Sequence, residues 1–418
     1  MPSTSTRPAQ DWRLLVAVFW AVAMVEGLGV SQIFAFVPVY LHEMGVPRDD
    51  RLVFVGLFSA LIFVVGAPLV PLWGVWADKY SRKAVIVRSA LVEAVVFAIA
   101  ALAREPWQLA VAILLIGFQL GNTGVMLAGI RDVTPLRRLG VTIAIFGAAA
   151  PIGFAIGPAL GGLFVDGFGW SLSAVFGFSA LLSLGTALLV TFGSREVRPE
   201  VIPQGSDISL AFGAVRGVLA DRSVRRIFAI FGLAFLATQM TRPFIPVLVE
   251  EVVGIGPGLV SAIALVAGTA ALVGALISPL GGALGDRIGF RPVLTAALLG
   301  GGISLLIMPF VGGIPVLAAI AVVLAMCTAA VSAMVFGMLA TDVPPERRSA
   351  TLNLVYLPLY AAGIVGPAVG GVVVAVGGLA APFITGAAIF LAGAVAIVVM
   401  GRRQPAEAAE AREAAAQA

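Results

Sequence analysis

The sequence predicts an all-α membrane protein of twelve transmembrane helices, arranged as two pseudo-symmetric six-helix bundles. Three observations support this prediction: an apolar composition, a series of long apolar runs, and landmarks that recur at almost one offset. Of the 418 residues, 60% are hydrophobic and 11% are charged, whereas a soluble domain has roughly 25% charged residues. The mean hydropathy is +1.07. This composition excludes a water-soluble globule of this size.

Each apolar run can cross a bilayer as a helix, because a spanning helix needs about 20 apolar residues. The runs are unbroken rather than alternating, which favours helices over the strands of a barrel. The first run is too long for a signal peptide and lacks a small-residue cleavage site, so we interpret it as the first helix. The predicted spans are 13–38, 52–77, 84–103, 107–130, 141–165, 171–193, 227–249, 257–281, 292–311, 314–340, 351–376 and 379–401.

Loop charges orient these spans. Arginine and lysine gather in the loops on the side of the termini, and an excess of basic residues marks cytoplasmic loops. The opposite loops hold only three basic residues, Arg48, Arg51 and Arg104. The excess of arginine over lysine, with abundant alanine and glycine, indicates a bacterial genome rich in GC. We therefore predict a multi-pass protein of a bacterial inner membrane with both termini in the cytoplasm.

The chain divides into two related halves. Four landmarks of the first half recur in order, from Phe36 to Phe244, Gly74 to Gly282, Asp132 to Asp342 and Gly157 to Gly366. Their offsets of 208, 208, 210 and 209 residues indicate a duplicated six-helix unit. Parallel repeats place a substrate site near the membrane midplane where the halves meet, which favours a carrier over a channel or an enzyme. The predicted parts are an N-terminal half at 1–193, a cytoplasmic linker at 194–226, a C-terminal half at 227–401 and a cytoplasmic tail at 402–418.

The loop after the second span carries the most specific motif. Its two glycines, one in each copy, would let helix backbones approach closely. Its acids can pair with the neighbouring cations or cap a helix. The simpler interpretation is that the cations only set the topology. The first copy reads Gly74-Val-Trp-Ala-Asp78-Lys79-Tyr-Ser-Arg82-Lys83, and the second reads Gly282-Ala-Leu-Gly-Asp286-Arg287-Ile-Gly-Phe-Arg291.

A second motif lies in the fifth span and recurs in the eleventh. Small residues four apart permit close contact between helices, and proline kinks a helix. Ordinary helix packing is the alternative explanation. The motif reads Gly153-x3-Gly157-Pro158-x2-Gly161-Gly162, and its repeat reads Gly366-Pro367-x2-Gly370-Gly371.

These motifs resemble those of the major facilitator superfamily, and within it the twelve-helix drug:proton antiporters related to tetracycline efflux proteins. The resemblance covers nearly the whole chain and implies the major facilitator fold. It implies that the first loop motif is a conformational latch and that the fifth-span motif is a hinge of exporters at the seam between the halves. Arg88 lies within snorkelling reach of the cytoplasm, so we expect it to join the cluster around Asp78. Gly117 stands where proton-coupled members carry an arginine in the fourth span, so this chain departs from their usual route of proton coupling.

Ionisable residues at membrane depth cost at least about 2.5 kcal/mol each and therefore indicate a function. We interpret Glu26, near the middle of the first span, as the proton or cationic-substrate site, with a neutral hydrogen-bonded carboxyl as the alternative. Arg242 would bind an anionic group, pair with an acid or snorkel to the headgroups. Glu93 is assigned to coupling or to structure. Neutral polar residues predict a cavity lining or interhelical hydrogen bonds: Gln119, Asn122, Gln239, Asn353, Tyr356 and Tyr360.

These features predict a secondary active transporter that exports small amphipathic or drug-like molecules by alternating access, coupled to protons. The alternatives are a sugar or metabolite exporter, an uncoupled facilitator, and a non-transporting membrane receptor. We find neither a catalytic cluster nor a Gly-x4-Gly-Lys-Ser/Thr loop in the sequence, which argues against an enzyme and against ATP use. The chain has one cysteine, Cys327, and one histidine, His42. We therefore expect no metal, no cofactor and no nucleic-acid partner, and we expect a monomer.

Overall fold

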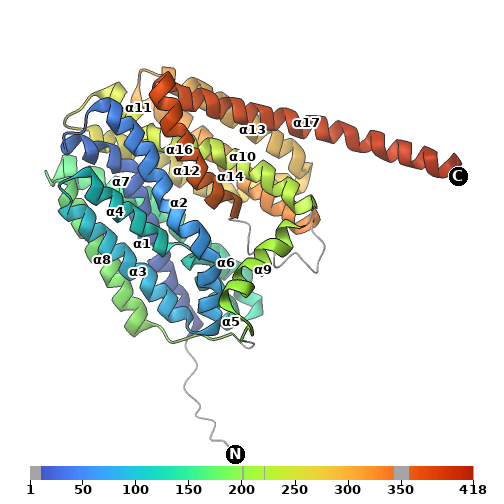
Figure 1. The fold of residues 1–418 in the computed structure, drawn as a ribbon, viewed down its shortest axis with the longest axis horizontal. Coiled ribbons are helices and arrows are strands. Elements are labelled where there is room, and N and C mark those ends of the chain that lie inside the picture. Colours follow the sequence, from blue (N-terminus) through green and yellow to red (C-terminus); the bar gives the residue numbers. More distant parts are fainter. Residues whose placement is uncertain (1–10, 200–201, 221, 343–356, 418) are drawn as a thin grey trace, which may run out of the picture. The chain divides into compact units, whose positions relative to one another are not determined.

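The computed structural model describes residues 11–199, 202–220, 222–342 and 357–417. Within these residues, twelve helical spans are long and apolar enough to cross a membrane, which confirms the predicted fold class (Figure 1). The spans are Trp12–Glu43, Arg48–Lys79, Arg82–Leu102, Pro106–Val133, Leu136–Gly167, Leu172–Gly193, Ile227–Val253, Leu259–Ile288, Phe290–Phe310, Ile314–Val335, Leu357–Gly377 and Ala380–Val399.

The chain forms two compact units, and one helix is shared between them. The first unit runs to Val46 and then from Leu61 to Arg216, and the second holds Pro47–Ala60 and the chain from Gly217 onward. The boundary at 216 lies inside the predicted linker 194–226. The assignment of residues 47–60 to the second unit was not predicted, because hydropathy shows where a span lies and not which helices it contacts.

The helices of the first unit begin at sequence signals for helix starts. Asp11, Ser81 and Ser171 each accept a hydrogen bond from a first-turn backbone N–H, at 2.9, 2.9 and 3.2 Å, which satisfies a donor that the helix leaves unpaired. The helices are α1 (Trp12–Glu43), α2 (Arg48–Lys79), α3 (Arg82–Leu102), α4 (Pro106–Ile116), η1 (Gly117–Gln119), α5 (Asn122–Val133), α6 (Leu136–Gly147), α7 (Ala149–Gly162), η2 (Leu163–Gly167), α8 (Leu172–Gly193) and α9 (Asp207–Leu219).

The fourth span is interrupted in its middle. It changes from α4 to the short 3-10 helix η1, turns at Gly121 with φ +91°, and resumes as α5. Glycine adopts this left-handed conformation without the steric cost that a side chain would bring. The interruption exposes backbone carbonyl groups of η1 to side chains of neighbouring helices, and short 3-10 segments within a helix often mark a functional position.

The glycine motif of the fifth span packs α7 against α1. A methyl group at Gly153 would lie 2.0 Å from the carbonyl oxygen of Met24, and one at Gly157 would lie 2.4 Å from that of Leu28. Only glycine permits this backbone-to-backbone approach. The contact lies inside the first unit, and the role of this motif as a hinge at the seam between the halves stays a prediction.

The second unit repeats this arrangement. Its eleventh-span motif packs α16 on α10, because methyl groups at Gly366 and Gly370 would lie 2.9 and 2.7 Å from the carbonyl oxygens of Leu236 and Met240. Helix α17 continues without interruption through the predicted tail. The helices of this unit are α10 (Arg222–Thr241), η3 (Arg242–Phe244), α11 (Ile245–Val253), α12 (Leu259–Ile288), α13 (Phe290–Ile307), η4 (Met308–Phe310), α14 (Ile314–Asp342), α16 (Leu357–Gly377) and α17 (Ala380–Gln417).

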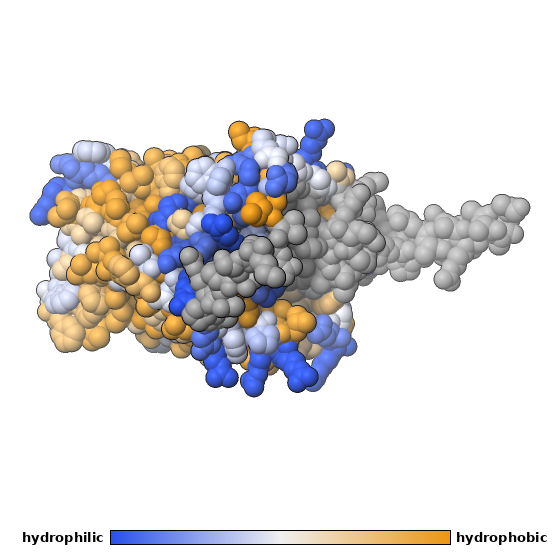
Figure 2. Space-filling model, turned by 90° about the horizontal axis from the view of Figure 1, so that it is seen from below, coloured by the Kyte–Doolittle hydropathy of each residue, from blue (hydrophilic) through white to orange (hydrophobic). Residues whose placement is uncertain are grey.

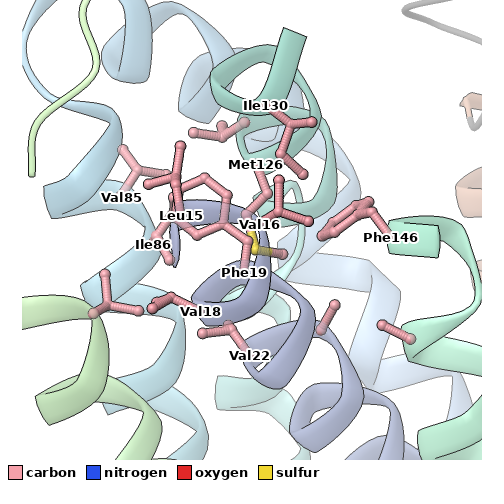
Figure 3. Close-up of a cluster of buried hydrophobic side chains, with 14 of the residues drawn as sticks. Leu15, Val16, Val18, Phe19, Val22, Val85, Ile86, Met126, Ile130 and Phe146 are labelled. Atoms are coloured by element: carbon pink, nitrogen blue, oxygen red, sulfur yellow. The ribbon is translucent and has the colours of Figure 1, made fainter. Parts of the chain in front are cut away.

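Apolar side chains fill the interior and also cover much of the surface. Figure 3 shows a cluster in the first unit, where Leu15, Phe19 and Val22 of α1 meet Ile86 of α3 and Met126 of α5. Lipid tails are as apolar as these side chains, so dispersion and close packing stabilise such contacts within a membrane. Figure 2 shows apolar residues over much of the coloured face, as expected for helices in contact with lipid.

Candidate functional site

Glu26 lies in a buried polar cluster within the first unit. Its Oε1 accepts hydrogen bonds from Ser89 Oγ of α3 at 2.8 Å and from Asn122 Nδ2 of α5 at 2.6 Å. Ser89 is fully buried, Asn122 is 2% exposed, and Glu26 itself is partly exposed. The predicted polar pair Gln119 and Asn122 is therefore brought to the predicted acid, whereas Ser89 was missed because a lone serine in an apolar run is common.

Ser89 joins this carboxyl group to the interrupted span. Its Oγ also lies 3.0 Å from the backbone carbonyl oxygen of Gln119, in η1. A hydroxyl group has one proton, so Ser89 can donate to Glu26 or to Gln119 at a given moment but cannot fully serve both. The hydrogen bonds at the junction of α1, α3 and η1 can therefore take two arrangements.

Arg88 belongs to this cluster, which corrects the prediction that it lies close to the loop motif. Its guanidinium carbon lies 3.7 Å from the centre of the Trp73 ring, a cation–π geometry. Its three nitrogen atoms are buried without a hydrogen-bond partner in the described residues. Glu26 is the carboxylate that stabilises the Arg88 charge electrostatically. Sequence reasoning failed here because it could not show which face of α3 meets α1 and α2.

Glu93, the second predicted acid of this half, is also buried. It lies one helical turn after Ser89 and is 1% exposed. Neither carboxyl oxygen forms a hydrogen bond in the part of the chain that the structure describes. The Ser183 side chain adjoins it, but the Ser183 hydroxyl donates to the Ser179 carbonyl at 3.0 Å. Glu93 therefore lies on a face of α3 that packs inside the first unit.

A second set of buried hydrogen bonds continues along α1 beyond Glu26. Gln32 is fully buried, its Nε2 donates to the Gly157 carbonyl at 3.3 Å, and its Oε1 accepts from Ser179 Oγ at 2.6 Å. These bonds tie α1 to α7 and α8. Gln32 was missed in the sequence, although its position on the same span as Glu26 could have indicated it.

Gly117 explains why the family arginine is missing. A methyl group here would lie 2.7 Å from the backbone nitrogen of Gly66 and 3.1 Å from the carbonyl oxygen of Ile62, both in α2. The close contact between α2 and the fourth span leaves no room for a longer side chain.

The first copy of the loop motif forms a charged cluster at the start of α3. The Arg82 side chain is 4% exposed and pairs with Asp78 at 2.8 Å and with Asp132 at 2.6 Å. The backbone nitrogen of Arg82 donates to Glu196 at 2.9 Å. Lys83 Nζ donates to the carbonyl group of Thr191 in the last turn of α8 at 2.6 Å and to that of Ser194, directly after α8, at 2.7 Å. The cluster joins α2, α3 and α5 to the chain that follows α8.

The second copy lacks such a cluster among the described residues. No described ion pair involves Asp286, Arg287 or Arg291, and residues 343–356, which include the matching segment, lie outside the described part. Methyl groups at Gly74 and Gly282 would meet no atom within 4 Å. The expectation that these two glycines permit close helix approach is therefore wrong for this structure.

Lys79 attaches the linker helix α9 to the end of α2. Its Nζ donates to Asp207 Oδ1 at 2.5 Å and to the Gly205 carbonyl at 2.9 Å. The hydrogen bond from the Lys79 ammonium holds the pKa of Asp207 below its ordinary value. A carboxylate with a lowered pKa contributes stability at neutral pH and loses it only as the pH falls through that lowered pKa.

We expect Asp207→Asn to loosen α9, because the amide cannot attract the Lys79 ammonium as a carboxylate does. Hydrogen exchange measured by mass spectrometry should become faster in residues 207–219 at neutral pH. Asp50→Asn, an exposed acid at the start of α2, is the matched control and should leave this exchange unchanged. Equal exchange in both variants would show that the pair does not hold the helix.

The remaining predicted residues lie in the second unit. Gln239 is 4% exposed on α10, where it packs beside Gly366. Arg242 begins η3, a break in the seventh span flanked by Pro243, and Tyr360 is partly buried on α16. The cavity residues predicted at positions 353 and 356 lie outside the described residues, so the predicted lining of the second half stays a prediction.

A buried ion pair in the second unit was not predicted. Arg51 Nη1 and Nη2 donate to Glu250 Oε2 and Oε1 at 3.0 and 2.7 Å, with 4% and 9% of the two side chains exposed. The neighbouring pair of Arg48 and Glu251 is much more exposed, at 57% and 40%. In the sequence, Arg48 and Arg51 indicate only the orientation of the spans, because the two members of each pair lie about 200 residues apart and their spacing gives no sign of contact.

These features define a class of protein. Twelve apolar spans fall into two units with the same glycine packing, and buried charges lie within the spans, which is the architecture of a membrane transporter built from repeats. The profile of the Major Facilitator Superfamily matches residues 19–272 and 227–418, and the chain belongs to this superfamily.

Named relatives agree with this assignment. The multidrug resistance protein MdtG of Citrobacter koseri is 29% identical over 303 residues, covering 72% of this chain and 73% of that protein. MdtG of Yersinia enterocolitica is 28% identical over 312 residues, covering 74% of each chain. The chain therefore resembles bacterial multi-pass inner-membrane proteins.

Solved structures show the same fold. A mutant of the nucleoside transporter NupG superposes with a TM-score of 0.78 at 15% identity, covering 92% of this chain and 99% of that one. A POT family transporter bound to a peptide conjugate gives a TM-score of 0.74 at 13% identity, covering 93% and 96%. At these identities the likeness concerns the fold alone.

Proposed function

We propose that the protein exports small amphipathic or drug-like molecules across the inner membrane by alternating access, in exchange for protons bound at Glu26. Membership of the Major Facilitator Superfamily supports secondary transport. Similarity to MdtG multidrug resistance proteins over about three quarters of the chain supports drug-like substrates and export. We further propose that both termini face the cytoplasm, as the basic loops indicate, and that the monomer is the working unit.

The environment of Glu26 is the observation that carries proton coupling. The carboxylate lies within a membrane span, is partly exposed, and is oriented by two neutral donors, Ser89 and Asn122. Arg88 compensates its charge without a hydrogen bond. The charge of this carboxyl group is compensated by a cation, and the group is partly exposed. Such a group can bind a proton in one state of the carrier and release it in the other.

Protonation of Glu26 would rearrange the junction around it. In the ionised state, Ser89 donates to the carboxylate. When a proton neutralises Glu26, the Ser89 hydroxyl is free to turn to the Gln119 carbonyl, 3.0 Å away. This change links the charge of the Glu26 carboxyl group in α1 to the interrupted fourth span, where the backbone already departs from a regular helix.

We expect Glu26→Gln to abolish drug-driven proton flux, because glutamine keeps the shape and the acceptor oxygen but cannot exchange a proton at this position. Purified protein in liposomes with an internal pH dye and ethidium as the probe gives the readout. Asp50→Asn, outside the cluster, should behave as the wild type. Proton flux of wild-type size in Glu26→Gln would remove Glu26 from the coupling step.

An uncoupled facilitator is the second candidate function, and Gly117 favours it. The backbone of α2 occupies the space that the family arginine would need. Ethidium flux across wild-type liposomes without any change of internal pH would support this alternative and contradict proton exchange.

A further inference from the structure

Glu93 is a buried acid that the proposed role of Glu26 leaves unused. It is 1% exposed, and its two carboxyl oxygens have no hydrogen-bond partner among the described residues. The backbone of α1 makes room for it, because a methyl group at Gly29 would lie 2.4 Å from Glu93 Oε1. A side chain at this position of α1 would displace the Glu93 carboxyl group or the Phe97 ring.

The two acids follow one another along the same contact between α1 and α3. Glu26 meets α3 at Ser89, and Gly29, three residues further along α1, meets α3 at Glu93, four residues after Ser89. Residues three and four apart lie on one face of a helix. The carboxyl groups are therefore separated by about one helical turn, or roughly 5 Å along the axis.

Few charges surround Glu93. Helix α1 contributes Glu26, and α8 contributes the neutral Ser183. On α3 itself, Arg88 lies five residues before Glu93. The sequences of α4 and α8 contain no ionisable residue, and the basic and acidic residues of α5, Arg131 and Asp132, lie in its last turn. Arg88 compensates the charge of Glu26, and Glu26 is the charged group that acts on Glu93.

The hydrogen-bond pattern shows which acid lacks a partner. Ionised carboxylate and amide oxygens can only accept, yet Gln119 Oε1 and both oxygens of Glu93 are buried without a donor. The Ser183 hydroxyl cannot supply one while it donates to Ser179. A proton on Glu93 supplies the missing donor and removes an uncompensated charge from the bundle interior.

We infer that Glu93 holds a second, exchangeable proton and passes it to Glu26 through the Ser89 hydroxyl, which takes up this proton as it gives its own to Glu26. This inference rests on the proposed coupling at Glu26. In the transfer, the O–H bond of Glu93 breaks as an O–H bond forms on ionised Glu26, and the total charge of the pair is unchanged. Glu26, which is partly exposed, exchanges with water, and Glu93 stores the proton. The Gln119 side chain adjoins both acids.

Infrared difference spectra of the purified protein in detergent test the inference without any substrate. At neutral pH we expect a carbonyl band of a protonated carboxylic acid that shifts on transfer to deuterated water. Glu93→Gln should lose this band, Glu93→Asp should move it, and Glu105→Gln, in a loop, should leave it unchanged. In Glu26→Gln the deuterium shift of the band should become slower, because the exchange route starts at Glu26.

Three results would overturn the inference: no acid band at neutral pH, a band that survives Glu93→Gln, or a band that never exchanges with deuterium. The last result would make Glu93 a sealed structural acid. A failure of the proposed function is recognised separately, because wild-type liposomes would then show ethidium flux without proton flux whatever the infrared spectra show. The Glu93→Asp variant keeps an acid at this position and allows the band to be assigned if Glu93→Gln does not fold.

Discussion

Replacement of Gly153 by alanine is expected to destabilise the first unit strongly. The new methyl group would lie 2.0 Å from the carbonyl oxygen of Met24 and 2.8 Å from the backbone nitrogen of Leu28. Both atoms belong to the backbone of α1 and cannot rotate away as a side chain can. Overpacking costs about 1–3 kcal/mol and occasionally more, and we expect the upper end of this range. Because Met24 and Leu28 flank Glu26, transport should fall together with stability.

Thermal unfolding in detergent, followed by tryptophan fluorescence, measures this effect. Gly147→Ala at the end of α6 is the matched control, because a methyl group there would meet no atom within 4 Å. In the control, alanine has the better helix propensity and adds at most about 1 kcal/mol to the free energy of unfolding. The unfolding temperature of the control should therefore stay unchanged or rise slightly. If both variants unfold at the same temperature, α7 does not pack on α1 as described.

Removal of one partner of the Arg51–Glu250 pair is expected to free the first turns of α2 from α11. Loss of one member of a buried ion pair costs about 3–5 kcal/mol, because the other charge is left uncompensated. Loss of a member of an exposed pair costs about 0–1 kcal/mol. Glu250→Gln should therefore have a large effect, and Glu251→Gln, which affects only the exposed pair with Arg48, a small one.

Cysteine labelling can measure this release. The only native cysteine, Cys327, is first replaced by alanine, and a cysteine is then placed at Leu52, which is 8% exposed. Since we assign this end of α2 to the outer face, a membrane-impermeant maleimide added to intact cells should label position 52 faster in Glu250→Gln than in the parent. The exchange of charges in Arg51→Glu/Glu250→Arg should slow labelling again. Equal rates of maleimide labelling at position 52 in Glu250→Gln and Glu251→Gln would show that the buried pair does not hold the start of α2 on α11.

The sequence predicted features that depend on residue type along one helix. Hydropathy gave the twelve spans, the offset gave the duplication, and the isolated charge at Glu26 indicated the buried cluster. Gln119 and Asn122 were also found, because two polar residues three positions apart share a face and an interrupted apolar run is visible in the sequence.

Features that depend on helix rotation and on distant partners were not predictable. Arg88 was assigned to the loop motif by its position near the start of α3, but its side chain lies on Trp73 beside Glu26. Arg51 and Glu250 looked like independent loop charges because only the folded chain brings them together. The glycine motif correctly indicated close packing, but a spacing pattern does not show which helix supplies the opposing backbone.

The shared helix α2 has a mechanical consequence. Its first turns belong by contact to one body and its remainder, from Leu61, to the other, so any rotation of the bodies against each other must be absorbed along its length. Two prolines, Pro68 and Pro71, follow the boundary at Leu61 within the same helix. Each proline removes a backbone hydrogen bond and makes the helix easier to bend. Helix α2 can therefore bend near its middle while its two ends keep their contacts.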